Sequence, residues 1–152
     1  MDDAETTPMQ LDDIEEIDSR LRQLVLTHLQ SGTSLLVMAY RRAGKTRLLD
    51  QCYANSNGRA VYFRLTGNET RRGTWRDLKR QLSSETMFTA IIFIDNADLL
   101  TDAPDDVKQA LEVTQKQLVI VGTINDGDTW QANFVQNRET NGNQIAYELI
   151  QV

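Results

Sequence analysis

Apolar residues recur every three or four positions near the start of the chain and gather into short unbroken runs further on. The periodic stretch covers residues 11–30 and predicts an amphipathic helix that ends at Gly32. Unbroken apolar runs are typical of strands whose two faces are both covered by helices, as in a parallel sheet. Strands are therefore expected over residues 34–39, 60–65, 90–94, 118–124 and 144–152.

Segments with helical spacing separate these runs. Helices are predicted over residues 45–54, 74–84 and 104–115. Residues 125–143 are rich in Asn, Gly, Asp and Thr, which predicts a long loop or a frayed helix. The alternation of strands and helices predicts an α/β fold with a parallel sheet of about five strands. We expect an acidic N-terminal tail over residues 1–10 and a single domain over residues 11–152.

The composition is that of an ordinary globular protein, with 40% hydrophobic and 25% charged residues among 152. The longest apolar runs are much shorter than the roughly 20 residues that a membrane-spanning helix needs. The first residues also lack the basic and apolar stretches of a secretion signal. We therefore expect a cytoplasmic protein that makes no contact with membranes.

The net charge of −6 conceals an uneven distribution of charged residues. Residues 1–18 hold eight acidic residues and no basic one, whereas residues 39–80 hold eleven basic and three acidic residues. Because the local field is set by nearby charges, an acidic chain can still present a surface that binds anions. The region from residue 39 to residue 80 is the candidate for such a surface.

A candidate phosphate-binding loop lies between the first predicted strand and the helix that follows it. Residues 39–46 read AYRRAGKT, with alanine where such loops usually have their first glycine. In this setting, backbone N–H groups and a helix N-terminus point at phosphates, a lysine adds positive charge, and a threonine hydroxyl can bind magnesium. We expect ATP to contact Ala39, Tyr40, Arg41, Arg42, Ala43, Gly44, Lys45, Thr46 and Arg47, and we expect Mg²⁺ to contact Thr46 among them. The alternative is an ordinary turn with a surface lysine.

An acidic residue, Asp95, follows the third apolar run. A carboxylate at the end of a buried strand beside the loop is a suitable second magnesium acceptor, after Thr46. In ATPases of this design the next residue is usually a glutamate that activates the attacking water. Here it is Asn96, which can orient a water but cannot take its proton. Asp98 is the alternative base, unless it belongs to a solvated turn, so the expected catalytic residues are Asp95, Asn96 and Asp98.

Three motifs together resemble the AAA+ and related STAND-type P-loop ATPases. They are RRAGKTRLL at 41–49, IIFIDNADLL at 91–100 and LVIVGTIN at 118–125, and the resemblance covers about residues 11–125. It implies a three-layer P-loop NTPase sandwich with a sheet ordered 5-1-4-3-2. It also implies that Lys45 and Thr46 contact phosphate and magnesium, that Asp95 is the acid on the magnesium side, and that Asn125 senses the γ-phosphate.

The resemblance further implies assembly into rings or filaments, in which an arginine of one subunit completes the site of the next. Arg138, in the polar loop before the last strand, is the candidate for that arginine finger, and the alternative is a solvated loop arginine. We expect no C-terminal helical lid after the last predicted strand, and the residue after Asp95 is not the usual catalytic glutamate. These departures favour a nucleotide-dependent assembly switch or an accessory ATPase with weak hydrolysis, and we expect self-association and a protein partner.

A run of basic residues follows the second strand. In DNA-transposition regulators of this superfamily, the corresponding region resembles a clamp on the DNA backbone, which implies contacts to DNA phosphates. The alternatives are a solvated helix face and a contact to the acidic segment of a neighbouring subunit. The run consists of Arg71, Arg72, Arg76, Lys79 and Arg80.

Two other functions stay open. The chain could be a degenerate P-loop module that does not hydrolyse ATP and serves as an interaction subunit, which Ala39 and Asn96 favour. It could also be a small-molecule kinase, which shares the phosphate loop but needs an arginine-bearing lid and an acceptor pocket.

Overall fold

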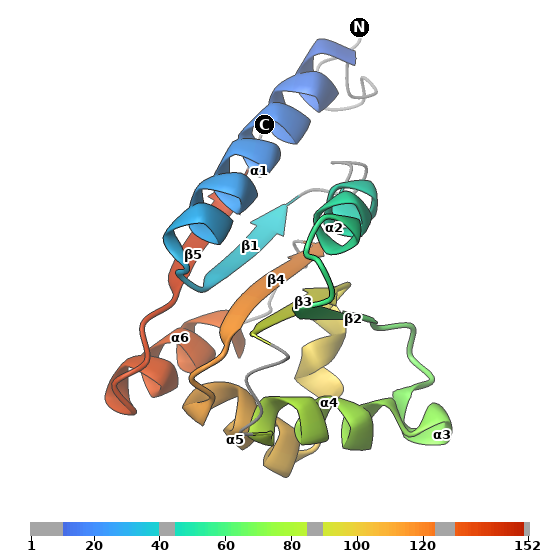
Figure 1. Cartoon of the computed structure of the whole chain (residues 1–152), viewed down its shortest axis with the longest axis vertical. Coiled ribbons are helices and arrows are strands. Elements are labelled where there is room, and N and C mark those ends of the chain that lie inside the picture. The colour runs from blue at the N-terminus through green and yellow to red at the C-terminus, as the bar shows by residue number, and fades with distance from the viewer. Residues whose placement is uncertain (1–10, 40–44, 85–89, 124–129, 151–152) are drawn as a thin grey trace, which may run out of the picture.

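The computed structural model of the chain describes residues 11–39, 45–84, 90–123 and 130–150 (Figure 1). The side chains of residues 11–18 and of Lys45 lie outside this description. The elements are α1 (Leu11–Ser31), β1 (Leu35–Ala39), α2 (Lys45–Ala54), β2 (Ala60–Arg64), α3 (Glu69–Arg72), α4 (Thr74–Ser83), β3 (Ile91–Asp95), the 3₁₀ helix η2 (Ala97–Asp102), α5 (Asp105–Val113), β4 (Gln117–Thr123), α6 (Trp130–Thr140) and β5 (Ala146–Ile150).

The five strands form one sheet in the order β2-β3-β4-β1-β5, and every neighbouring pair is parallel. This is the predicted order 5-1-4-3-2 read from the other edge, so the α/β class and the sheet order are confirmed. Each predicted strand overlaps the observed one, with ends that differ by one or two residues. Because the strands are parallel, their carboxyl ends all meet at one edge of the sheet, which is where ligands bind in folds of this kind.

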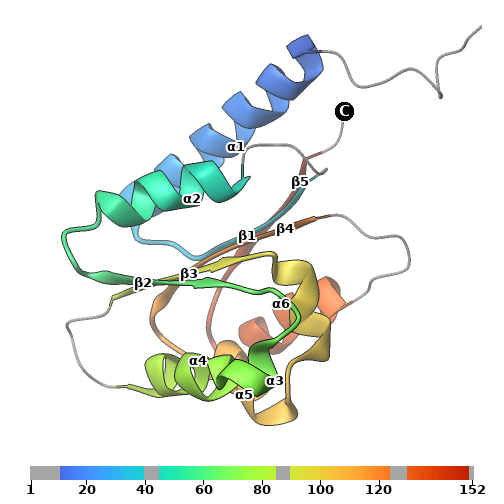
Figure 2. The same ribbon diagram turned by 90° about the vertical axis from the view of Figure 1, so that its right-hand side faces the viewer.

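Helices cover both faces of the sheet (Figure 2). Side chains alternate along β1, so that Leu35 and Val37 pack with α1 and α2, while Leu36 and Met38 pack with α4, α5 and α6. In β3, Phe93 faces the side of α1 and α2, and Ile94 faces the other. Two separate apolar cores result, and they account for the unbroken apolar runs in the sequence.

The N-terminal helix α1 runs along one face of the sheet and is 21 residues long. It buries Leu21 and Val25 completely, at the three-to-four-residue spacing that predicted the helix. Arg22 and Gln23, between these two residues, are exposed, so only one stripe of the described side chains of α1 contributes to the core. Among the helices of the described residues, none is long and apolar enough to cross a membrane.

The segment before the last strand differs from the prediction. Residues 125–143 were expected to form a loop or a frayed helix, whereas the described part of this segment contains α6, an 11-residue helix. Its buried positions, Gln131, Phe134 and Arg138, have helical spacing. Two of these three residues are polar, so the pattern of apolar residues alone could not indicate the buried face.

Candidate functional site

The carboxylate of Asp95 forms the centre of a polar cluster at the carboxyl edge of the sheet. Asp95 is the last residue of β3 and has 0% of its surface exposed. Its Oδ2 accepts hydrogen bonds from the Thr46 hydroxyl at 2.5 Å and from the Tyr62 hydroxyl at 2.9 Å. Its Oδ1 accepts one from the backbone N–H of Asn96 at 2.8 Å. The buried charge is therefore stabilised by three donors.

Thr46 reaches Asp95 from the first turn of α2, the helix that follows β1. The two residues are 49 positions apart in the sequence, and packing of α2 against β3 brings them into contact. The structure thus places together the hydroxyl and the carboxylate that the sequence analysis assigned to one magnesium ion.

A hydroxyl and a carboxylate oxygen fit a magnesium ion. Mg²⁺ prefers oxygen ligands, keeps several waters, and in nucleotide sites takes one or two side chains together with phosphate oxygens. Within the described ranges, no group of three or more His, Cys, Asp or Glu side chains gathers that could hold a metal ion. Among the described residues, the oxygens that Thr46 and Asp95 offer are therefore not part of a larger cluster of metal-binding side chains.

Much of the predicted phosphate loop lies outside the described residues, and so does the predicted sensor. These positions are Tyr40, Arg41, Arg42, Ala43, Gly44 and Asn125. At the borders of the loop, Ala39 is a fully buried residue at the end of β1, Lys45 is the first residue of α2, and Arg47 is exposed on α2. Binding of phosphate by the loop stays a prediction.

Two residues of β2, Tyr62 and Arg64, belong to the cluster and were not among the predicted site residues. The Nε of Arg64 lies 3.7 Å from Oδ2 of Asp95, and its Nη2 donates to the Asp50 carboxylate at 3.2 and 3.3 Å. The guanidinium also lies over the Tyr62 ring, 5.6 Å from its centroid. The sheet order did carry a signal for this, since it places the end of β2 beside the end of β3, where Arg64 is the register partner of Asp95.

The Tyr62 hydroxyl stays protonated beside Asp95. Burial raises the pKa of Tyr62 well above its usual value of about 10. A hydrogen bond to Tyr62 and the nearby carboxylates raise the pKa of Arg64, so its guanidinium keeps its charge. At neutral pH, Asp95 therefore has a neutral hydroxyl donor and a positive charge on the β2 side.

The two residues considered as water activators, Asn96 and Asp98, both contact other strands. Asn96 adopts a left-handed backbone conformation, with φ of 57°, and its Nδ2 donates to the carbonyl of Leu65 at 2.8 Å. Asp98 lies in η2, and its Oδ1 accepts a hydrogen bond from the backbone N–H of Thr123 at 3.4 Å. These contacts link β3 and η2 to the ends of β2 and β4, and the catalytic roles of both residues stay predictions.

The structure corrects the expectation for Arg138. This residue was placed in a polar loop as an arginine finger, but it lies in α6 with only 2% of its surface exposed. Its Nη1 donates to the carbonyls of Leu111 and Thr114, at the end of α5, at 2.7 and 3.3 Å. The finger assignment is wrong for the side chain in this position, because a buried guanidinium that holds the end of a helix cannot reach a neighbour's nucleotide.

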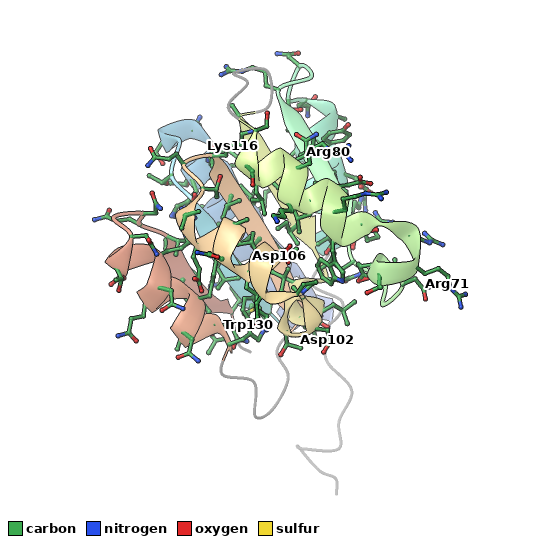
Figure 3. All side chains as sticks on the ribbon, turned by 90° about the horizontal axis from the view of Figure 1, so that it is seen from below. Arg71, Arg80, Asp102, Asp106, Lys116 and Trp130 are labelled. Atoms are coloured by element: carbon green, nitrogen blue, oxygen red, sulfur yellow. The ribbon has the colours of Figure 1, made fainter. Side chains whose placement is uncertain are left out.

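The basic run lies on α3 and α4, on the face of the sheet opposite α2. All five of its side chains are exposed, and Figure 3 shows Arg71 and Arg80 at the surface of this layer. Lys79 pairs with Asp106 at 3.0 Å, and Arg80 lies 3.5 Å from Asp77. The remaining three, Arg71, Arg72 and Arg76, form no ion pair within the described part of the chain. They leave an excess of positive charge on this surface.

No protein-family model matches this chain, and no curated protein matches it either. The function is therefore inferred from the site itself and from the three motifs.

Proposed function

We propose that the chain is an AAA+-like P-loop domain that binds ATP with Mg²⁺ and whose nucleotide state controls self-assembly or contact with a partner. The observation that carries the proposal is the hydrogen bond between Thr46 and Asp95. In a phosphate loop, the threonine hydroxyl and an acid from a neighbouring part of the sheet are the groups that serve a shared magnesium.

The position of α2 supports the same proposal. This helix begins at Lys45, a few residues after β1 ends, so its N-terminus lies at the carboxyl edge of the sheet. The first N–H groups of a helix have no partner within the helix and carry partial positive charge, which favours a bound phosphate. The loop sequence before α2 would supply further N–H groups.

The chain's own residues would then divide the work at the site. Lys45 and the N–H groups of residues 40–46 would bind the β- and γ-phosphates, and Thr46 and Asp95 would hold Mg²⁺. The bound ion would neutralise charge on the phosphate oxygens. The burial of Asp95 strengthens its interaction with a cation, because water screens the charge less there.

Slow hydrolysis follows from the residue after Asp95. Asn96 cannot accept a proton from water, and its amide nitrogen already donates to Leu65. A domain that binds ATP but hydrolyses it slowly suits a switch, because the ATP-bound state persists long enough to support assembly. The same features support the second candidate, an interaction subunit that binds nucleotide and does not hydrolyse it.

The partner surface is proposed on α3 and α4. The excess of positive charge at Arg71, Arg72 and Arg76 would favour either DNA phosphates or the acidic N-terminal segment of another copy. DNA and another copy of the chain are both partners that a protein in the proposed cytoplasmic location could meet.

The proposal is tested with Lys45→Ala, with Lys79→Ala as the matched control on the opposite face of the sheet. We expect Lys45→Ala to abolish ATP binding in calorimetric titration with Mg²⁺, and Lys79→Ala to bind like the wild type. Lys79 is an exposed residue whose partner is Asp106, so its loss should affect neither the site nor the fold. Equal affinities for ATP in the wild type and in Lys45→Ala would refute the phosphate loop.

A further inference from the structure

Strand β2 places the positive charge of Arg64 beside Asp95. The proposed function does not use this charge. Tyr62 and Arg64 are two residues apart on β2, so both side chains lie on the same face of the sheet. Tyr62 packs with the core on the side of α2, and Arg64 is the register partner of Asp95. The pair therefore approaches Asp95 from the side of the sheet edge, whereas Thr46 approaches it from α2.

Arg64 lies between two carboxylates that differ in exposure. The hydrogen bonds from its Nη2 to Asp50 measure 3.2 and 3.3 Å, and the ion pair of its Nε with Asp95 is longer, at 3.7 Å. The Arg64 and Asp50 side chains are 45% and 55% exposed, while that of Asp95 is 0% exposed. The guanidinium thus extends from the solvent-exposed surface of α2 to the buried acid.

One oxygen of Asp95 receives most of these contacts. Oδ2 accepts the hydroxyl hydrogens of Thr46 and Tyr62 and also lies 3.7 Å from Nε of Arg64. A metal ion at Oδ2 would compete with these donors for the same lone pairs. It would also be repelled by the guanidinium, because two positive charges at such short range raise the energy of the metal-bound state.

We propose that Arg64 takes the place of the divalent cation beside Asp95 while no metal is bound, and that Asp50 holds Arg64 when the metal enters. The inference rests on the proposed function, because it concerns the metal of that same site. Arg64 would set the concentration of divalent cation at which the site fills. It is a regulatory residue rather than a catalytic one.

The geometry supports such an exchange. Arg64 already makes its shorter contacts to Asp50, so it can give up Asp95 without losing all of its carboxylate partners. The Tyr62 ring keeps the guanidinium near both acids. Because Arg64 is nearly half exposed, water screens its charge, and the effect on metal affinity should be about three- to ten-fold rather than several orders of magnitude.

The test is a titration with Mn²⁺ of protein held in excess over ATP, so that little free nucleotide binds the ion, and it follows the loss of the paramagnetic resonance signal of free Mn²⁺. We expect Arg64→Gln to lower the Mn²⁺ concentration at half-occupancy by about three- to ten-fold. Arg64→Lys keeps the positive charge, so its Mn²⁺ concentration at half-occupancy should stay closer to that of the wild type. Arg80→Gln is the matched control, because it removes one exposed arginine from α4 on the other face of the sheet, and it should leave the Mn²⁺ titration unchanged.

A second substitution is expected to change the required Mn²⁺ concentration in the opposite direction. Asp50→Asn removes the other acceptor of Arg64, so the guanidinium should stay with Asp95 and raise the Mn²⁺ concentration required by about two- to three-fold. In the Arg64→Gln background the same substitution should have a clearly smaller effect, since the residue through which it acts is gone. Tyr62→Phe keeps the ring under Arg64, removes one donor to Oδ2, and should lower the required Mn²⁺ by about two-fold.

The outcomes separate this inference from the proposed function. If the wild type binds ATP and Mn²⁺ but Arg64→Gln fills at the same or a higher Mn²⁺ concentration, the role of Arg64 is refuted and the nucleotide site stands. If the wild type binds neither ATP nor Mn²⁺, both proposals fail. Thermal unfolding of each variant accompanies the titration. Should Arg64→Gln fail to fold, Asp50→Asn and Tyr62→Phe still give opposite expected shifts, and equal or absent shifts would contradict the inference.

Discussion

Asp95 and Arg138 are both buried charged residues, yet their partners differ in kind. Asp95 lies at the carboxyl edge of the sheet and is bound mainly by side chains, those of Thr46, Tyr62 and Arg64. Arg138 lies near the amino ends of β1 and β4, and it donates to two backbone carbonyls at the end of α5. Side chains can turn towards a ligand, whereas backbone carbonyls at the end of a packed helix cannot. Asp95 is thus a buried charge whose side-chain partners can rearrange, whereas the partners of Arg138 are fixed.

The largest loss of stability is expected for Arg138→Ala. The substitution leaves the carbonyls of Leu111 and Thr114 without their donor and removes a packed side chain from α6, which should lower the free energy of unfolding by about 2–4 kcal/mol. Denaturant unfolding measures the change. Glu139→Ala, an exposed neighbour on the same helix, should stay within about 0.5 kcal/mol of the wild type. A loss for Arg138→Ala as small as that of the control would remove the contrast with Asp95.

A smaller loss is expected at the carboxyl edge for Gly122→Ala. A Cβ at this position of β4 would lie 2.9 Å from the backbone nitrogen of Asp98 and 3.2 Å from the Cβ of Ala97. The 3₁₀ helix η2 would have to move away from β4, at a cost of about 1–3 kcal/mol in the free energy of unfolding. Thermal unfolding tests this. An unchanged melting temperature would mean that η2 packs more loosely than the structure shows.

Asn96→Glu sharpens the comparison within the site. Asn96 resembles Arg138 in that its amide donates to a backbone carbonyl, that of Leu65, and its left-handed backbone is one that asparagine adopts more readily than glutamate. The substitution should cost about 1–2 kcal/mol of unfolding free energy. It also places a base after Asp95, so ATP turnover should rise if position 96 faces the attacking water. Measuring both quantities on one preparation separates the two roles, and lower stability with unchanged turnover would make Asn96 a structural residue.

The smallest effect on stability is expected for the combined replacement of Arg71, Arg72 and Arg76 by glutamine. These side chains are exposed, so the free energy of unfolding should change by less than about 0.5 kcal/mol. If they contact DNA phosphates, each lost contact should reduce the steepness of the log-log salt dependence by about one unit. If they contact another subunit, sedimentation with ATP should show an assembly defect without DNA. Identical sedimentation profiles in all conditions would mean that these three arginines belong to a solvated surface and contact neither partner.

Patterns in the sequence predicted most of the fold, because parallel strands buried on both faces are unbroken apolar runs. The helix at residues 45–54 was predicted with its observed ends. The basic run could be located, but not its division into α3 and α4, because Gly73 separates them by adopting a left-handed conformation that no apolar pattern shows.

Local motifs predicted part of the site and missed what depends on the register of the sheet. Thr46 and Asp95 each belong to a motif, and the two residues meet as expected. Arg64 belongs to no motif and reaches Asp95 only because β2 lies beside β3. Arg138 was misassigned because its burial depends on α6, whose buried face includes polar residues.

The central claim is a nucleotide site in which Thr46 and Asp95 serve the magnesium ion, and ATP titrations of the wild type and of Asp95→Asn, each with and without Mg²⁺, test it most directly. We predict that the wild type binds ATP and that Mg²⁺ strengthens the binding. Asp95→Asn should bind ATP equally with and without Mg²⁺. It should unfold at a temperature close to that of the wild type, because the donors to Oδ2 are side chains that can rearrange and an amide oxygen can still accept from the backbone N–H of Asn96. Absence of ATP binding by the wild type, or an undiminished effect of Mg²⁺ in Asp95→Asn, would contradict the account.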